Sequence, residues 1–197
     1  MSKSISCIKL ILLGDSNVGK TSIVQRYMHN KFQDEQSPTI GAAFDTSKIL
    51  ISGIQYELNI WDTAGQEAYR SLLPMFFRSA NIAMITFDVT SRSSFEAVPE
   101  WLSEVKQQAY ENVIIILVAN KIDLEERRMI LQEEIVTMAK KCNASISETS
   151  ASTGQGIEQA FESALMLYIL GGQIKRDSLD NDKMINIKNE KERNRCC

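Results

Sequence analysis

The stretch that decides the fold is Gly14-Asp15-Ser16-Asn17-Val18-Gly19-Lys20-Thr21, which has the phosphate-binding pattern G-x-x-x-x-G-K-T. The apolar run Cys7–Leu13 before it reads as a buried strand, and Thr21–Met28 after it reads as the start of a helix. The two glycines let successive backbone N–H groups turn inward, and the helix N-terminus adds partial positive charge. We therefore expect the loop to surround phosphates, with Lys20 adding a full charge and the Thr21 hydroxyl binding Mg²⁺.

Composition sets the class of the protein. The 197 residues are 44% hydrophobic and 24% charged with a net charge of −3, which predicts one domain with a short tail and no general affinity for nucleic acid. The four cysteines (Cys7, Cys142, Cys196 and Cys197) match no metal or disulfide spacing, which favours a reducing compartment. The N-terminus is too short and polar for a signal peptide, and no apolar run approaches 18 residues. We therefore expect a cytosolic protein that reaches membranes only through an anchor.

Strand and helix patterns alternate along the chain. Strands are predicted at 7–13, 43–51, 54–61, 82–89, 113–119 and 144–146, and helices at 21–30, 93–110, 132–141 and 157–170. Ser52-Gly53 predicts a hairpin between the second and third strands, and Ser91 or Ser93 is expected to cap the 93–110 helix. This order predicts an α/β fold: a parallel sheet with helices on both faces and one antiparallel strand. Residues 173–197 are polar and charged, so we expect a folded domain at 1–172 and a disordered tail at 173–197.

The segment Trp61–Glu67 carries a second set of chemical groups. Asp62 stands at the end of a predicted strand, where its carboxylate can hold Mg²⁺ through water. The Gly65 N–H can reach a terminal phosphate oxygen because no side chain blocks it. Gln66 is placed to orient a water molecule for in-line attack.

Two further motifs select the base. Asp123 in Asn120-Lys121-Ile122-Asp123 can accept two N–H bonds from guanine, whereas adenine has no such donor pair. A site of this kind rejects an analogue that lacks the bonds by about 10⁴–10⁵-fold. Lys121 can lay its stem over the purine, and Asn120 can join neighbouring loops. In the segment Glu148–Ala151, the Ala151 N–H is placed to meet guanine O6.

These motifs make the chain similar to the Ras-like small GTPases, and most closely to the Rab family, over about Ile8–Leu170. Rab-like signatures are Ile40–Phe44, Tyr69–Leu72 and Phe76–Arg78, and the paired alanines within Ile40–Phe44 look most like the early-endosomal branch. The resemblance implies the small G-protein fold, a doubly wound P-loop NTPase with a mostly parallel six-stranded sheet and helices on both faces.

The resemblance also implies a full set of site residues. Phe32 would pack against the base, Thr39 would bind Mg²⁺ and the γ-phosphate, and the two switches would span about 31–44 and 65–78. The implied catalytic residues are Gln66, Lys20 and Gly65, and the implied metal ligands are Thr21, Thr39 and Asp62. The implied binding residues for GTP or GDP are Ser16, Asn17, Val18, Gly19, Lys20, Thr21, Ser22, Phe32, Thr39, Asp62, Gly65, Asn120, Lys121, Asp123, Ser150, Ala151 and Ser152.

Three aromatic residues and two cysteines have roles implied by the family. Phe44, Trp61 and Phe76 match positions that Rab proteins use to bind effectors, although an aromatic residue near a sheet face more often belongs to a core. Cys196-Cys197 matches a geranylgeranyl acceptor pair, and two lipid chains give stable attachment where one is marginal.

Two positions depart from the family pattern. Ala68 stands where many Rab proteins carry Arg, which puts exchange-factor contacts in question. Ser152 stands where a Lys is usual after Ser-Ala, so we expect somewhat weaker guanine binding or faster nucleotide release.

The implied function is a Rab-like switch that cycles between GDP and GTP, hydrolyses GTP slowly and recruits effectors in vesicle trafficking. Implied partners are an exchange factor, a GTPase-activating protein, a prenylation escort and a GDP-dissociation inhibitor, with the protein itself a monomer. The implied location is the cytoplasmic face of intracellular membranes, endosomal membranes above all, with a cytosolic pool. Two alternatives are a scaffold that holds GTP with hardly any hydrolysis and a nucleotide kinase; Gln66 and Thr39 argue against the first, and Asn120–Asp123 argues against the second.

Overall fold

The computed structural model describes residues 6–33, 37, 39–65, 73–109 and 112–171. The predictions for Gln66, Ala68, Cys196 and Cys197, and for the tail as a whole, therefore lie outside the described residues.

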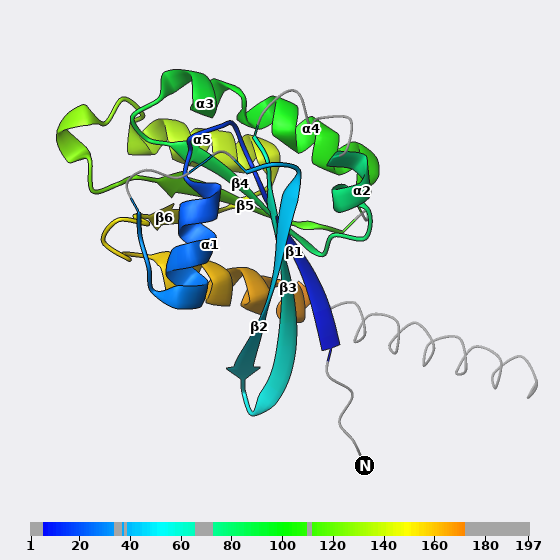
Figure 1. Ribbon diagram of the computed structural model, residues 1–197. Coiled ribbons are helices and arrows are strands. Elements are labelled where there is room, and N and C mark those ends of the chain that lie inside the picture. The colour runs from blue at the N-terminus through cyan, green and yellow to red at the C-terminus, as the bar shows by residue number, and fades with distance from the viewer. Residues whose placement is uncertain (1–5, 34–36, 38, 66–72, 110–111, 172–197) are drawn as a thin grey trace, which may run out of the picture.

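A six-stranded sheet forms the centre of the molecule (Figure 1). Its strand order is β2-β3-β1-β4-β5-β6, and every neighbouring pair is parallel except the antiparallel β2–β3 hairpin. Ser52 and Gly53 form the hairpin turn with positive φ angles of 50° and 76°. This topology confirms the expected doubly wound sheet. The strands are β1 (Ser6–Leu13), β2 (Ala42–Ile51), β3 (Ile54–Thr63), β4 (Ile82–Asp88), β5 (Ile114–Asn120) and β6 (Ser145–Thr149).

Two hydrophobic cores lie on opposite faces of the sheet, because successive strand residues point to opposite sides. Ile11 and Leu13 of β1 join the core shared with α2 (Leu73–Phe77), α3 (Arg92–Glu96), α4 (Val98–Gln108) and α5 (Gln132–Cys142). Leu10 and Leu12 join the core shared with α1 (Lys20–His29) and a last helix at 157–171. Figure 1 shows α1 and that last helix on one side of the sheet, with α3, α4 and α5 on the other.

The prediction of one helix over 93–110 is wrong, because the segment forms two helices, α3 and α4. Ser91 caps α3 by accepting a hydrogen bond from the Ser94 N–H, as one of the two expected caps. The chain breaks at Ala97, and Pro99 stands in the first turn of α4. Because Pro99 has no N–H to donate to the Phe95 carbonyl four residues earlier, the helical hydrogen-bond pattern is interrupted, and a new helix begins with Pro99 in its first turn.

The third strand is two residues longer than the predicted 54–61. Strand β3 continues through Thr63, and α2 begins at Leu73. A single 3-10 turn at Glu125–Arg127 was not expected either.

The parallel strands all end at one edge of the sheet, which is where ligands bind in open α/β folds. The loops that follow β1, β3, β5 and β6 carry the sequence motifs, so the fold collects them at this edge. Within the described part of the chain, no helix is both long enough and apolar enough to span a lipid bilayer.

Candidate functional site

A cavity of about 460 Å³ opens at the carboxyl edge of the sheet. Its size suits a small-molecule ligand of nucleotide dimensions. Its walls contain these predicted site residues: Ser16, Asn17, Gly19, Lys20, Thr21, Ser22, Phe32, Thr39, Gly65, Asn120, Lys121, Asp123, Ala151 and Ser152. The fold thus brings five separate stretches of sequence around one space.

Three predicted residues lie behind the cavity wall. Val18, Asp62 and Ser150 are at most 2% exposed and do not line it. Val18 offers its backbone carbonyl to Asn120, Asp62 accepts from Thr21, and Ser150 closes the turn of the last loop. Val18, Asp62 and Ser150 therefore support the residues that face the cavity, and Asp62 keeps one carboxylate oxygen without a hydrogen bond among the described residues.

Four further residues line the cavity that the motifs did not indicate: Gln33, Ser37, Thr63 and Leu124. Each stands within a few residues of a predicted site residue, and that closeness in the sequence is the signal that could have indicated it.

Lys20 begins α1 and turns its side chain into the phosphate loop. Its Nζ donates hydrogen bonds of 2.7 Å to the carbonyls of Gly14 and Asp15. Burial lowers the pKa of Lys20 to about 8, and the charges of Asp62 and Asp15 oppose this shift. A buried ammonium group is stabilised strongly by a nearby negative charge, because little water screens the attraction. A phosphate-binding site needs a cation of this kind.

Thr21, Thr39 and Asp62 meet beside Lys20. The Thr21 hydroxyl donates a 2.6 Å bond to Asp62 Oδ2 and lies 2.7 Å from the Thr39 hydroxyl. Because Thr21 has only one hydroxyl proton, Thr39 is the donor in the second bond. Burial raises the pKa of Asp62, while the bond from Thr21 and the charge of Lys20 oppose the rise.

This trio fits the chemistry of Mg²⁺. Asp62 Oδ1 is buried and makes no hydrogen bond with the described residues, so one carboxylate oxygen is free for a further partner. Magnesium is held in such sites by one or two carboxylates together with hydroxyl, water and phosphate oxygens. No cluster of three or more His, Cys, Asp or Glu residues occurs among the described residues, so a metal site here depends on oxygen atoms of this mixed kind.

Two glycines allow the backbone to approach closely around the cavity. A Cβ at Gly65 would collide with the backbone of Asp15 and Ser16, so only glycine lets the end of β3 meet the phosphate loop. A Cβ at Gly19 would collide with the Asn120 amide, and its φ of 97° is itself unfavourable for other residues.

Asn120 joins three loops, as its motif predicted. Its Nδ2 donates to the Val18 carbonyl at 2.8 Å, and its Oδ1 accepts from the Thr149 hydroxyl at 3.1 Å. Arg128 supports the same region, because it pairs with Glu148 at 2.8 Å. The phosphate loop and the two base motifs are therefore one connected unit.

Lys121 and Asp123 stand at the other end of the cavity. Asp123 is exposed at the cavity wall, where its carboxylate is open to a ligand. Lys121 adopts a left-handed backbone with φ of 66°, and its Nζ pairs with Asp88 Oδ2 at 2.7 Å. That ion pair was not foreseen, and it fixes the Lys121 stem along the cavity wall.

Trp101 on α4 supplies another unforeseen contact. Its indole N–H donates a 2.8 Å bond to Asp15 Oδ1 of the phosphate loop. The bond fastens the loop to the helix layer on one face of the sheet. In a sequence, a tryptophan that falls on the apolar face of a predicted helix is assigned to the hydrophobic core. The partner of its indole N–H cannot be identified from the pattern.

The three aromatic residues expected on the surface form a row. Phe44 and Trp61 are cross-strand partners with ring centroids 5.0 Å apart, and Phe76 lies 5.5 Å from Trp61. Phe44 is 52% exposed, whereas Trp61 and Phe76 are half-buried. Lys9 Nζ lies 5.1 Å from the Trp61 ring and donates to the Arg78 carbonyl. The row is thus a partly exposed aromatic surface, and the Lys9 ammonium group contacts its central ring, that of Trp61.

Comparisons with known proteins identify the family of the chain. The model of the Ras family matches residues 9–169. Ras-related protein Rab-19 of Homo sapiens is 42% identical over 154 residues, which are 78% of this chain and 71% of the relative. GTP-binding protein ypt5 of Schizosaccharomyces pombe is 43% identical over 155 residues, 78% and 74% of the two chains. Putative ras-related protein Rab-5B of Dictyostelium discoideum is 43% identical over 153 residues, 78% and 71% of the two chains.

The family model spans nearly the whole described domain, and each of these relatives matches over 78% of this chain. The chain belongs to the Rab branch of the Ras family of small GTPases.

Proposed function

We propose that the cavity at the sheet edge is the guanine-nucleotide site of this GTPase, with the roles of its residues as follows. Residues 16–22, from the phosphate loop and the first turn of α1, hold the phosphates, and Lys20 supplies the main positive charge. Asn120, Lys121, Asp123, Ser150, Ala151 and Ser152 form the base end, and Phe32 packs beside it. The observation that supports this assignment is that one cavity joins the phosphate loop, Thr39, Gly65 and both base motifs.

As a Rab family member, the protein binds GTP and GDP with Mg²⁺, hydrolyses GTP and acts as a switch in vesicle trafficking. Thr21, Thr39 and Asp62 are the proposed ligands of the metal. When bound, Mg²⁺ neutralises charge on the β- and γ-phosphate oxygens and so favours phosphoryl transfer.

The protein's own groups position the reaction. Lys20, held by two carbonyls in the loop, stabilises negative charge on the phosphates, and the Gly65 N–H donates toward the γ-phosphate. Gln66, which lies outside the described residues, orients the attacking water. No arginine is among the described residues that line the cavity. Intrinsic hydrolysis is therefore slow, and an activating protein raises its rate by about 10³–10⁵-fold.

The switch output uses the segments next to the site. Thr39 and Gly65 connect the γ-phosphate to the stretches that lead into Phe44 and Phe76, so the aromatic row reports the bound nucleotide. Rab membership implies exchange factors, activating proteins, a GDP-dissociation inhibitor and effectors as partners, and association with intracellular membranes. We assign effector contacts to the aromatic row, and prenylation, assisted by an escort protein, to Cys196 and Cys197 of the tail at 173–197.

The endosomal membrane is the proposed location. It is supported by the paired alanines of Ile40–Phe44 and by similarity to a Rab-5B of Dictyostelium discoideum. A tagged full-length protein should label endosomes, and a Cys196→Ser/Cys197→Ser variant should become diffuse. Labelling of another organelle would refute the location while leaving the nucleotide site intact.

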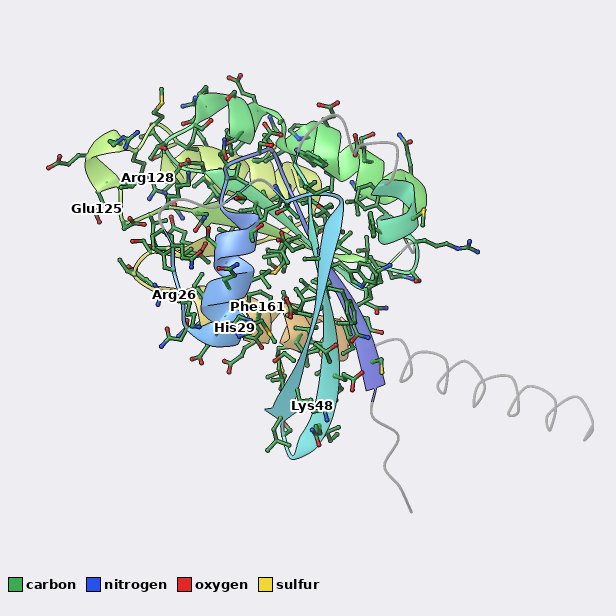
Figure 2. All side chains as sticks on the ribbon, viewed as in Figure 1. Arg26, His29, Lys48, Glu125, Arg128 and Phe161 are labelled. Carbon is green, nitrogen blue, oxygen red and sulfur yellow. The ribbon has the colours of Figure 1, made fainter. Side chains whose placement is uncertain are left out.

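The Asp123→Asn variant tests the nucleotide assignment. A carboxylate accepts from guanine N1–H and the 2-amino group, whereas an amide can donate to the 2-oxygen of xanthine. We expect the variant to lose about 10⁴-fold in GDP affinity and to gain affinity for xanthosine diphosphate. The control is Glu125→Gln, which removes an exposed carboxylate two residues away that does not line the cavity (Figure 2).

The same preparation separates the competing activities. Wild-type protein with GTP should release phosphate, with no transfer to an added nucleoside monophosphate. Transfer would favour the nucleotide kinase, and GTP binding without phosphate release would favour the scaffold.

A further inference from the structure

Arg26 on α1 makes an unusual set of contacts for a half-buried helix residue. Its Nε donates to the Ala151 carbonyl at 2.8 Å, and its Nη2 donates to the Ser152 carbonyl at 2.7 Å. Its Nη1 donates to the Asn30 carbonyl at 3.2 Å and to Asn30 Oδ1 at 3.0 Å. One guanidinium therefore reaches from α1 to the loop after β6 (Figure 2).

The loop that Arg26 reaches is otherwise a small turn closed mainly on itself. Ser150 N–H donates to the Gln155 carbonyl, Gly154 N–H donates to the Ser150 carbonyl, and Thr153 N–H donates to Ser150 Oγ. The outer carbonyls, at Ala151 and Ser152, accept from Arg26. The Ala151 N–H shares a peptide plane with the Ser150 carbonyl, which accepts from Gly154, so its direction within the turn is set locally. Arg26 fastens the whole turn to α1 through the next two carbonyls, and so sets where the Ala151 N–H lies relative to the cavity.

The other side of the guanidinium holds the end of α1. Asn30 is the left-handed C-cap of the helix, with φ of 52°. Phe32, two residues later, lines the cavity. Arg26 therefore joins the two segments that border the base end of the cavity, Phe32 on one side and Ala151 on the other.

We infer that Arg26 is a positioning residue that holds the Ala151 N–H toward guanine O6 and thereby slows nucleotide release. The inference rests on the proposed nucleotide site. Arg26 lies outside the cavity wall and acts through Ala151, Ser152 and Asn30.

Arginine suits this task because its guanidinium has five donors in a fixed plane. A lysine ammonium is a point donor on a flexible stem and cannot serve two carbonyls and Asn30 from one plane. Ser152 has no long side chain to cover the base, so here the loop depends on its backbone being held from α1.

The test compares Arg26→Gln and Arg26→Lys with a matched control, Arg92→Gln. Arg92 is a matched control because it too donates to a backbone carbonyl, that of Met129, at 2.6 Å. It also pairs with Glu134 at 2.6 Å. It makes no contact with the loop after β6. Release is measured for GDP and for the diphosphate of 6-thioguanosine, which keeps N1–H and the 2-amino group for Asp123 but replaces O6 by sulfur, a weaker acceptor. Single-turnover GTP hydrolysis is measured alongside.

Both Arg26 variants should release GDP about ten-fold faster, since they lose hydrogen bonds from a charged donor. Release of the 6-thio analogue should change by less than about two-fold, because its sulfur accepts only weakly from the Ala151 N–H. Arg92→Gln should leave both rates unchanged, and hydrolysis should be the same in all variants.

Three results would overturn the inference. The Arg26 variants could release both nucleotides faster by the same factor, Arg26→Lys could release GDP at the wild-type rate, or Arg92→Gln could accelerate GDP release as much as Arg26→Gln. If Arg26→Gln does not fold, Arg26→Lys makes the same comparison. Wild-type protein that fails to retain GDP would refute the proposed site and this inference together. Wild-type retention with unchanged release in the Arg26 variants would refute this inference alone.

Discussion

The Asn120 amide donates a 2.8 Å hydrogen bond to the Val18 carbonyl, although the two residues are 102 positions apart in the sequence. Asn120 is 1% exposed and also accepts from Thr149. The bond makes the phosphate loop and the base motif a single rigid unit. A nucleotide that leaves this unit must break contacts at both ends at once.

Asn120→Ala should therefore accelerate GDP release by roughly ten- to a hundred-fold, because it leaves the buried Val18 carbonyl and Thr149 hydroxyl without this partner. An unsatisfied buried polar group costs about 1–3 kcal/mol. Release of fluorescent GDP checks the rate. Asn59→Ala is the control, since Asn59 bonds Thr46 at the exposed surface of the hairpin. Equal rates in the two variants would contradict the coupling.

Lys20→Met should stabilise the nucleotide-free protein while weakening GDP binding. The pKa of Lys20 is about 8 against an ordinary 10.5, which corresponds to about 3 kcal/mol of destabilisation when the group is charged. Because the folded pKa is the lower one, the unfolded chain holds more protons between pH 8 and 10.5, and the stability of wild type rises with pH there.

The gain from Lys20→Met should thus be largest near pH 7 and shrink as the pH approaches 10.5. Urea unfolding in EDTA at several pH values measures it, with Lys140→Met at an exposed position of α5 as control. A gain that stays constant with pH would show that the charge of Lys20 is not the cause.

Gln66→Leu should lower single-turnover hydrolysis at least ten-fold and prolong effector binding, because leucine cannot hydrogen-bond the attacking water. GDP release should stay at the wild-type rate. Phosphate release from preloaded GTP measures the step, and Gln55→Leu, at an exposed position of β3, is the control. Wild-type hydrolysis in the variant would remove Gln66 from the catalytic set.

Phe44→Ala should reduce effector capture in the GTP state by ten-fold or more without changing nucleotide affinity. Phe44 is 52% exposed and packs on Trp61, so the variant removes the outer aromatic ring and leaves the nucleotide cavity intact. Aromatic anchors of this kind supply much of the energy of an interface. Leu50→Ala, another exposed hydrophobic residue on β2, is the control. An equal loss in both variants would argue for a general effect of surface hydrophobicity.

Local motifs predicted most of the fold and the site. Gly14–Thr21 and Ser52-Gly53 determine their own backbone conformation within a few residues, so their consequences are visible in the sequence. The break between α3 and α4 had a local signal as well, Pro99, which the helical spacing of the apolar residues concealed.

Contacts between distant residues were not predictable in the same way. Trp101 with Asp15, Lys121 with Asp88 and Arg26 with Ala151 each depend on which strands become neighbours and how far a helix is rotated. Arg26 in particular looks like an ordinary polar residue of an amphipathic helix. Its partners are backbone carbonyls, and a backbone acceptor leaves no residue-specific mark in a sequence.

The bond from Trp101 to Asp15 fastens the phosphate loop to α4. Because α4 and the loop are fastened together, we expect loss of the γ-phosphate to shift the chain around Thr39 and Gly65 while the α4 side stays in place. A partner that docks on the outer side of α4 meets the same surface in both nucleotide states. Such a partner could stay attached through the whole cycle and bring regulators to the protein without sensing its state.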